Sequence, residues 1–461
     1  MRTEQQLVSF ICGISFRDLP SAVVSTTKDQ LLADFGTAIA GAHAEGCETV
    51  VAMAKEAGGR PEASILVHGG KVPAQQAAFV NAVMARALDF CDAAVPGAHS
   101  GTAIIPAALA AAELVGGVSG ADFLTAVALG TEVALRMNLG EAEYDGFDPT
   151  GVCVPFGSSA AAAKILGLSE VETWNALGLA FCRCGGSFQA NVDGALAVRV
   201  IEGWVAETGI TCARLAGRGI TGPANFLEGV YGYLHLFGRD RVTGDSIASG
   251  LGNDYQTGKL VFKKYPSCGA TQASTQMILD MMVEERFGAE DVERIEVTVP
   301  PYVHRLVGHP FRVGSNPKVN AQFSIRYCVA NALTRKGSRL AHFEEDAINE
   351  PDVLQLVQKI EVIPDAALDI RGHTAVDMRV LTKDGREYLR STDVAPGFPG
   401  SPLTKDEHLR RFKDCIGFAA APPEAQKVAS IIESIARLEE MSNIRELVPL
   451  LQVYPRGVDS L

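Results

Sequence analysis

The sequence lacks the patterns that mark several common classes of protein. Its ten cysteines follow no repeated spacing, which is typical of reduced thiols in the cytosol rather than of a disulfide framework. Basic residues are in the minority, with 41 Lys and Arg against 54 Asp and Glu and a net charge of −13. A nucleic-acid binder normally carries a clustered basic face. We therefore expect a cytoplasmic protein with no nucleic-acid partner.

Long uninterrupted apolar runs are also missing. The two most apolar windows, 101–120 and 123–139, are broken by Glu113 and by Glu132 with Arg136. Neither provides the roughly 20 apolar residues that a bilayer-spanning helix needs. The N-terminus carries Glu4 and no small-residue cleavage site, so we do not expect a signal peptide. The sequence predicts a soluble protein with no membrane partner.

The usual nucleotide, metal and hydrolase motifs are absent as well. The chain contains no GxxxxGK[ST], no GxGxxG in a strand–turn–helix setting, no HExxH and no GxSxG. Cys182 and Cys184 are the closest cysteine pair, but a single intervening residue is a poor chelating spacing. We predict that both are buried helical thiols and that the protein holds no metal ion or iron–sulfur cluster.

What the sequence does contain, up to about residue 260, is a succession of Ala-, Leu- and Val-rich segments with apolar residues three and four apart. This periodicity predicts helices that pack closely in an all-helical domain. The predicted helices are 27–42, 48–57, 73–89, 102–115, 120–139, 156–166, 170–181 and 195–216.

The pattern changes near residue 263 and indicates a second, α+β region. Alternating residues predict strands at 292–299 and 360–363. Asp384-Gly385 joins 378–382 to 387–392 and favours a hairpin. Helices are predicted at 321–335 and 350–359 and, after the break 396–402, at 405–412 and 423–441. We expect this C-terminal tail to pack on the first domain.

Several polar residues stand out in apolar surroundings. Asp89 and Asp92 follow a predicted helix, and His99 lies in the Pro- and Gly-containing loop before the next helix. A carboxylate and an imidazole at such a junction can act as an acid/base pair, and an anionic substrate is favoured at the helix N-terminus. The same residues also fit a structural role, in which the aspartates cap the helix end and His99 is an ordinary loop residue.

Two further groups have the same ambiguity. Tyr144 and Asp148 lie in EAEYDGFDPTG, which fits either a polar site loop or an ordinary Asp- and Gly-rich turn. Lys263 and Lys264 lie at the predicted domain boundary, where small-ligand sites are common and a lysine pair suits a carboxylate. The alternative is a solvated charge pair on a linker.

Taken together, the segments of this chain resemble the MmgE/PrpD family, which includes 2-methylcitrate dehydratase, cis-aconitate decarboxylase and iminodisuccinate epimerase. The matching segments follow the family order between Leu31 and Thr404. They are LLADFGTAIAG, FVNAVMARALDFCDAAVPGAHSGTAIIPAALAAAE, GTEVALR, PFGSSAAAAKILGL, GITGPANFLEG, FKKYPSCGATQ, NAQFSIRYCVANAL and PGFPGSPLT.

The resemblance implies a mainly α fold. A large all-helical domain, 1–265 plus 400–461, would carry an inserted α+β lid domain, 266–399. It also implies a homodimer without metal or organic cofactor. The family's substrates are small di- and tricarboxylates, from which a proton is removed, or to which it is returned, at a carbon next to a carboxylate.

Site residues are carried over by position. Asp89 and His99 match the acidic and His members of the signature loop, and Lys263 matches the Lys that opens the family's K-x-[YF]-P segment. The resemblance makes His99 the general acid/base, Asp89 its anchor and Lys263 the cation that stabilises enolate-like charge. Tyr144 is a candidate second proton donor. The candidate substrate-binding residues are Arg199, Lys264, Asp148, Cys268 and Gln272.

The chain departs from the family at several basic positions. The usual His-Pro-Ser is His99-Ser100-Gly101, and the His of a GFHPT-like loop is Asp148. A Lys-x-Leu-His stretch is replaced by 198–201, which loses the Lys and the His but contains Arg199. The Cys-or-His after the family's YP pair is Cys268, and a later common His is Gln272. A citrate-like trianion would be poorly neutralised by this set.

We therefore expect a cofactor-independent lyase of small carboxylic acids. A hydro-lyase is the first expectation and a decarboxylase the other lyase form. The departures fit an epimerase as well, because no leaving group then needs a proton. The alternative that is not an enzyme is a family member that binds a metabolite or a partner protein without catalysis.

Overall fold

The computed structural model describes residues 2–140, 143–314 and 316–452. The chain forms two compact units, Met1–Leu260 with Arg411–Leu461 and Val261–Arg410. The domain limits expected from the sequence, after 265 and before 400, stay a prediction. In the ranges that the structure describes, no helix combines the length and the apolar character needed to cross a bilayer.

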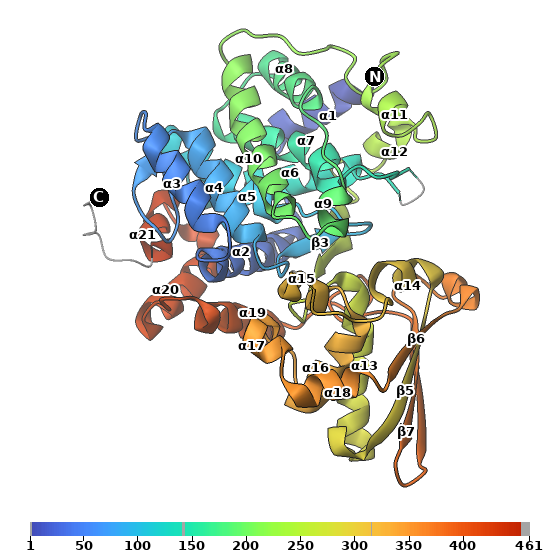
Figure 1. Cartoon of the computed structure of the whole chain (residues 1–461). Helices are drawn as coiled ribbons and strands as arrows, with labels where there is room; N and C mark the ends of the chain where they lie inside the picture. The colour runs from blue at the N-terminus through green and yellow to red at the C-terminus, as the bar shows by residue number, and fades with distance from the viewer. Residues whose placement is uncertain (1, 141–142, 315, 453–461) are drawn as a thin grey trace. The chain divides into compact units, whose positions relative to one another are not determined.

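The first unit is built from helices (Figure 1). Its helices are α1 (Thr3–Gly13), α2 (Ser21–Gly41), α3 (Cys47–Ala57), α4 (Ala74–Arg86), α5 (Gly101–Leu114), α6 (Gly120–Met137), α7 (Pro149–Ile165), α8 (Glu170–Phe181), α9 (Gln189–Val192), α10 (Ala197–Ala216), α11 (Tyr233–Leu236), α12 (Gly244–Ala248), α20 (Ala425–Ala436) and α21 (Val448–Leu451). Short strands are β1 (Ala63–Ser64), β2 (Lys71–Val72) and β3 (Asp92–Ala94). The strand β4 (Leu260–Phe262) and the helix α19 (Lys405–Phe418) carry the chain across the unit limits.

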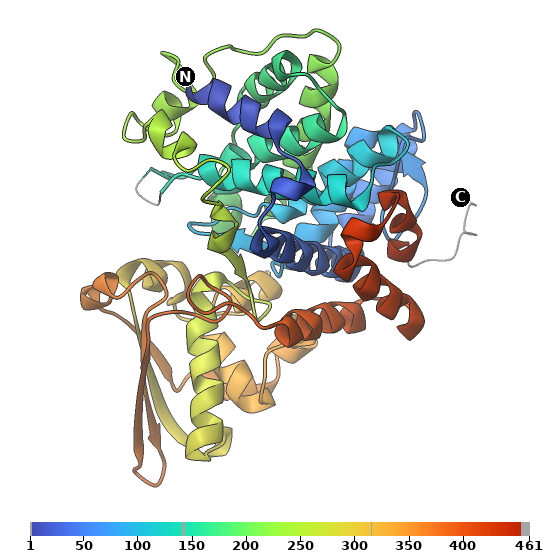
Figure 2. The ribbon, with the colours of Figure 1, turned by 180° about the vertical axis from the view of Figure 1, so that it is seen from behind.

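The core of the first unit is the Ala-rich set α5, α6 and α7, whose residues are almost all buried. Gly130 and Gly157 let α6 and α7 approach closely. A Cβ at Gly157 would lie 2.4 Å from the carbonyl oxygen of Gly130. Small side chains thus let these helices pack closely against one another, as the sequence predicted. Seen from behind, the C-terminal helix α20 lies beside α2, which it contacts (Figure 2).

The second unit is α+β, as expected. Its sheet has the order β6–β5–β7–β8, formed by β5 (Val292–Val299), β6 (Ile360–Pro364), β7 (Val376–Thr382) and β8 (Glu387–Thr392). The pair β5–β6 is parallel, and β5–β7 and β7–β8 are antiparallel. The predicted hairpin is confirmed, with Gly385 at φ +86° in its turn. The helices are α13 (Gln272–Glu285), α14 (Pro301–Val307), α15 (Pro317–Gln322), α16 (Ile325–Arg335), α17 (Glu345–Ile348) and α18 (Pro351–Val357).

Several local predictions were wrong. The helix predicted at 156–166 begins seven residues earlier, at Pro149, because Asp148 caps it and a proline suits the first turn. The helix predicted at 321–335 is two helices, since the first ends at Gln322 and Ser324 caps the start of the next. Cys182 is exposed and, like Cys184, follows α8 rather than lying within a helix. The helix α1 was not predicted.

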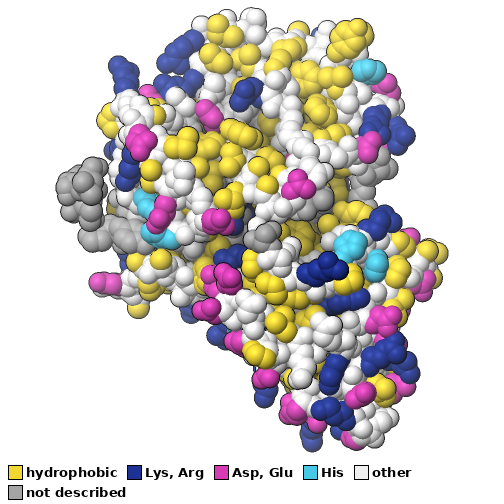
Figure 3. Space-filling view, in the orientation of Figure 1, with side chains coloured by type: hydrophobic (Ala, Val, Ile, Leu, Met, Phe, Trp, Pro, Cys, Tyr) yellow, Lys and Arg dark blue, Asp and Glu magenta, His cyan; other side chains and the backbone are white. Residues whose placement is uncertain are grey.

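One face of the second unit is locally basic. Histidine and basic side chains gather over α14 in the space-filling view (Figure 3). His309 Nε2 donates a hydrogen bond to the carbonyl oxygen of Arg305, 2.6 Å away, and the ring of His309 lies 6.2 Å from that of His304. This surface is therefore locally basic, although the chain as a whole is acidic.

Candidate active site

The site of the first unit is centred on the loop between α4 and α5, which carries Asp89 and His99. Asp89 has a φ of +52° and pairs with Arg86, whose Nη1 donates to Asp89 Oδ1 at 2.7 Å. Aspartate tolerates this left-handed conformation better than most residues do. The salt bridge and the turn together fix where the chain leaves α4.

His99 is held by hydrogen bonds at its backbone and its ring. Its Nδ1 lies 2.7 Å from the carbonyl oxygen of Asp92, and its backbone N–H donates to Thr150 Oγ1 at 3.0 Å. Because a carbonyl oxygen only accepts, Nδ1 must carry the proton. The ring is therefore either the tautomer with a lone pair on Nε2 or, when protonated, an acid at that atom. The hydrogen bond to Asp92 thus fixes the protonation of Nδ1 and the orientation of the ring.

The carboxylate of Asp92 anchors this loop to the start of α5. It accepts hydrogen bonds from Gln30 Nε2 at 2.9 Å, from Ser100 Oγ at 2.8 Å and from the backbone N–H of Gly101 at 3.1 Å. A charge-assisted bond to a helix N-terminus is favourable, because unpaired N–H groups point there. Asp92 therefore caps α5 and fixes the carbonyl that orients His99, whereas the sequence left its role open.

Asp34 of α2 lies against the same turn. Its Oδ1 accepts the backbone N–H of Asp92 at 3.4 Å. Burial, reinforced by the charge of Asp92, raises the pKa of Asp34 well above its ordinary value, against the effect of Arg411. Arg411 in turn donates to the carbonyl oxygen of Phe90 and lies over its ring at 4.4 Å. The carboxyl groups of Asp34 and Asp92 and the guanidinium of Arg411 thus hold the loop in place.

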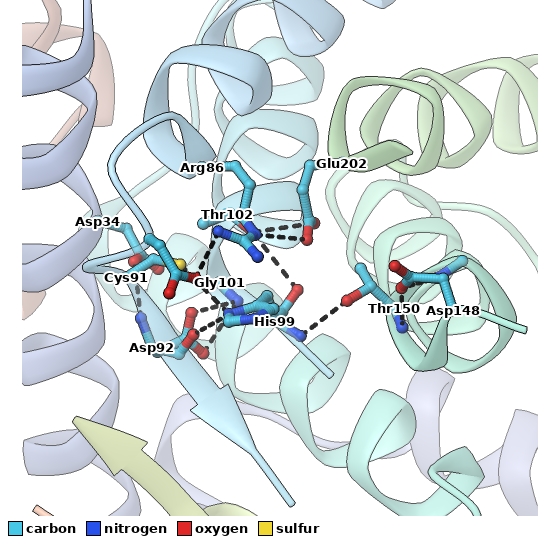
Figure 4. A network of polar contacts seen from close by, with 12 residues as sticks. Asp34, Arg86, Cys91, Asp92, His99, Gly101, Thr102, Asp148, Thr150 and Glu202 are labelled. Carbon is cyan, nitrogen blue, oxygen red and sulfur yellow. Dashed lines mark hydrogen bonds and ion pairs between the residues drawn. The ribbon is translucent and has the colours of Figure 1, made fainter. Parts of the chain in front are cut away.

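Arg86 and Glu202 complete the cluster shown in Figure 4. Arg86 Nε lies 3.6 Å from Glu202 Oε1, and Thr102 Oγ1 donates to Glu202 Oε2 at 3.0 Å. Burial raises the pKa of Glu202 well above its ordinary range, against the pull of Arg86. This carboxyl therefore keeps its proton to a higher pH than an exposed glutamate does.

Asp148 is close to this cluster but is committed to a helix end. It is the N-cap of α7 and accepts the backbone N–H of Thr150 at 2.8 Å and of Gly151 at 3.4 Å. Burial raises its pKa, while Arg86 and the cap bonds lower it. The sequence left open whether Asp148 transfers protons or caps the following helix, and the structure shows the cap.

Tyr144 and Arg199 are likewise engaged by the protein. The hydroxyl of Tyr144 donates to Asn138 Oδ1 at 2.7 Å and accepts the backbone N–H of Leu139 at 3.2 Å. Burial raises the pKa of Tyr144 far above its ordinary value, so its phenol is a poor proton source. Arg199 of α10 donates from Nη1 to the carbonyl oxygen of Glu45, and burial lowers its pKa. Its role as a substrate ligand stays a prediction.

The other predicted residues belong to the second unit. Lys263 is 4% exposed and directly follows β4. Lys264 pairs with Glu407 at 2.8 Å and helps to lower the pKa of that carboxyl to about 2, against its burial. Cys268 is buried, and its backbone N–H donates to the carbonyl oxygen of Gln322.

Gln272 holds the loop that carries these residues. Its Nε2 donates to the carbonyl oxygens of Tyr265 at 3.0 Å and Ser267 at 3.2 Å, and its Oε1 accepts the backbone N–H of Tyr265 at 2.9 Å. A buried amide with both ends bonded to the backbone is a structural element. We therefore do not carry Gln272 into the proposed chemistry.

The sequence analysis missed three members of the first-unit cluster, Asp34, Arg86 and Glu202. Asp34 and Arg86 are single charged residues inside the apolar helical segments LLADFG and AVMARAL, and Glu202 lies three residues after Arg199 in VRVIEG. That signal was visible, because an isolated charge on a buried helix face needs a partner. What the sequence could not show is that the three helices bring these charges to one loop.

The comparisons with known proteins agree with this architecture. The MmgE/PrpD N-terminal domain matches residues 5–244 and the MmgE/PrpD C-terminal domain matches residues 265–437. The chain belongs to the MmgE/PrpD family, as the sequence resemblance indicated.

Curated relatives are similar over most of their length. A cis-aconitate decarboxylase-like protein of Aspergillus oryzae is 25% identical, with 97% of this chain and 96% of the relative covered. The cis-aconitate decarboxylases of Homo sapiens and Mus musculus are 27% and 24% identical. The human protein is covered over 80% of its length, with 83% of this chain, and the mouse protein over 93%, with 96% of this chain.

Proposed function

We propose that this protein is a lyase that decarboxylates a small di- or tricarboxylic acid, with proton transfer by His99. The observation that carries the proposal is the fixed Nδ1 of His99, 2.7 Å from the carbonyl oxygen of Asp92. Because Nδ1 donates to that carbonyl oxygen, we assign the proton transfer with the substrate to Nε2. Family membership and relatives that are named cis-aconitate decarboxylases support the lyase class.

The choice between lyase reactions rests on how many proton donors the site supplies. Dehydration needs an acid for the departing hydroxyl as well as a base for the carbon. In decarboxylation the C–C bond to the carboxylate breaks, carbon dioxide leaves, and the electron pair left on the substrate takes one proton. Of the proton donors expected from the sequence, Tyr144 and Asp148 are bonded within the protein. This suits decarboxylation, which takes one proton, better than the hydro-lyase reaction expected first.

Lys263 keeps the part that the resemblance gives it, which is to offset the negative charge of the substrate. The proposal also retains the absence of a cofactor, the homodimer and the cytoplasmic location as predictions. Proton transfer by an imidazole and charge stabilisation by an ammonium group need no metal ion. Dialysis of the protein against EDTA should therefore leave the rate unchanged.

Proton NMR in D₂O tests the proposal directly. The protein is incubated with cis-aconitate, citrate, 2-methylcitrate, malate, tartrate and iminodisuccinate. Proton NMR follows the products, and carbon-13 NMR of the same samples follows the released carbon dioxide. We expect loss of carbon dioxide from one acid and deuterium at one product carbon. A new alkene without carbon dioxide would instead show a hydro-lyase.

Deuterium exchange with inversion and no new product would show an epimerase, the second candidate. It would use two acid/base groups on opposite faces of one carbon, and the departures from the family support it because no leaving group then needs a proton. Thermal stabilisation by an acid without exchange would show a binding protein and overturn the catalytic proposal.

A further inference from the structure

Arg86 is a buried arginine that leaves most of its donors unused. It ends α4, is 6% exposed and makes its hydrogen bond through Nη1, to Asp89. Its Nε is fully buried without a hydrogen bond, and 3.6 Å separates it from Glu202. Among the residues that the structure describes, none accepts from Nη2. A guanidinium has five N–H donors, and buried donors are nearly always bonded.

The charge around Arg86 is less balanced than its three carboxyl neighbours suggest. Asp89 forms the close ion pair at 2.7 Å. Glu202 and Asp148 are buried, and burial raises the pKa of both groups, which favours their neutral forms. Of the three carboxyl groups, only that of Asp89 lies within hydrogen-bond distance of the guanidinium, since Glu202 Oε1 is 3.6 Å from Nε.

Arg86 also stands where this chain has lost the basic residues of its family. Those positions are Val198 and Ile201 on α10 and Asp148 before α7. Glu202, next to Ile201, and Asp148 both interact electrostatically with Arg86. The guanidinium of Arg86 thus lies beside the two segments in which the chain departs from the family at basic positions.

The location is that of the proposed chemistry. Arg86 interacts electrostatically with Cys91, whose Sγ lies 3.3 Å from Nδ1 of His99. Figure 4 shows the guanidinium and the imidazole in the same group of contacts, on either side of the Cys91 turn. Asp89 and His99 each keep 8% exposure, so the cluster is not sealed from solvent.

We propose that Arg86 binds a carboxylate of the substrate through N–H groups of Nη1 and Nη2 that do not bond to Asp89, whereas the buried Nε faces Glu202. A carboxylate accepts from the flat edge of a guanidinium in a fixed direction, which a lysine cannot reproduce. Arg86 is then a specificity-determining residue of this chain. This inference rests on the proposed function only in taking the ligand to be a small polycarboxylate.

Calorimetric titration with tricarballylate, a saturated tricarboxylate that cannot lose carbon dioxide by the proposed route, separates binding from turnover. Arg86→Gln should weaken binding by roughly 10- to 100-fold. Arg86→Lys should weaken it by less, because lysine keeps the positive charge but cannot donate two parallel hydrogen bonds to a carboxylate. Asp89→Asn should bind at least as tightly as the wild type, since it removes the charge that competes with the ligand.

Arg136→Lys is the matched control. Arg136 is a buried arginine of the same unit whose donors are taken by Glu132 and by the carbonyl oxygens of Ile247, Ser249 and Asp254. It should bind tricarballylate as the wild type does. If Arg86 merely anchors the loop, Arg86→Gln and Asp89→Asn will weaken binding alike, and that result overturns the inference.

Absence of tricarballylate binding by the wild type, or equal binding by Arg86→Gln, would also overturn it. Binding that depends on Arg86 without any turnover of the acid panel would instead leave the inference standing and reject the proposed lyase. The titration therefore tests the role of Arg86, and the NMR assay tests the proposed lyase, so that either proposal can be rejected without the other.

Discussion

At the scale of single residues, the chemistry of His99 depends on one hydrogen bond from Nδ1 to a backbone carbonyl. A side chain as the partner of Nδ1 would share its proton according to pH, whereas a carbonyl oxygen accepts at every pH. The orientation of the ring therefore follows from the fold of the 89–101 loop. The departures from the family at 148, 198 and 201 leave this bond intact, because none of those residues makes it.

His99→Gln should lower kcat by about 100-fold or more, the usual range for a lost general acid or base. The thermal midpoint should change little, because the backbone N–H of residue 99 still bonds to Thr150. The NMR assay gives the rate and calorimetry the midpoint. His235→Gln is the control, since His235 is exposed and pairs with Asp240. A variant at 99 that keeps more than a tenth of the wild-type rate would remove His99 from the mechanism.

Lys263→Ala should lower kcat/KM by about 100-fold through loss of a preorganised cation, while the chain stays folded. Lys259→Ala, at an exposed position four residues earlier, should retain the wild-type rate. The readout is again product formation from the acid that the wild type consumes. Full activity of Lys263→Ala would show that Lys263 does not act on the substrate.

At the scale of elements, the start of α5 is the most constrained helix end near the site. Gly101 has no space for a side chain, since a Cβ there would lie 1.8 Å from Asp34 Oδ2 and 2.9 Å from Asp92 Oδ1. The family usually has His-Pro-Ser where this chain has His99-Ser100-Gly101. The glycine allows two carboxyl groups to approach the helix end at once.

Gly101→Ala should therefore destabilise the protein by about 1–3 kcal/mol, the range for overpacking a tight interior. It should also lower kcat, because the displaced Asp92 carries the carbonyl that orients His99. Gly13→Ala is the matched control, because a Cβ at the last residue of α1 meets nothing within 4 Å. Chemical denaturation measures the free energy of unfolding. Equal stability of the two variants would contradict the packing described here.

At the scale of the whole molecule, buried acids make stability depend on pH in an unusual direction. Asp34 holds its proton in the folded state to a higher pH than in the unfolded chain, where its ordinary pKa is 3.8. Its contribution to the free energy of unfolding is thus complete below that value and is lost as pH rises toward the folded pKa. The loss falls in the range above the ordinary value of an aspartate.

Asp34→Asn should remove this loss, because the amide resembles the protonated acid. We expect its thermal midpoint to match that of the wild type below pH 3.8, where Asp34 is protonated in both states, and to exceed it near pH 8. Glu113→Gln is the control, since it breaks a buried carboxylate's bonds to Ser64 and Lys71 and should lower the midpoint at both pH values. A midpoint of Asp34→Asn below the wild type at pH 8 would mean that Asp34 is ionised in the folded protein.

The sequence by itself determined the family, the helical and α+β regions and the loop that carries Asp89 and His99. Periodicity and local turn chemistry are short-range properties, so α8 and the β7–β8 hairpin could be predicted from neighbouring residues. Helix starts such as Pro149 were less certain, because a cap competes with the turn-forming character of Asp and Pro.

Only the tertiary structure decided which charges share a site. Periodicity assigns a residue to the buried face of its helix but does not name the helix opposite. Asp34, Arg86 and Glu202 come from α2, α4 and α10, and they meet at one loop. Burial then sets their protonation, because desolvation depends on every surrounding element. The tertiary structure likewise turned Asp148 and Gln272 from candidate ligands into structural groups, by bonding their polar atoms to nearby backbone.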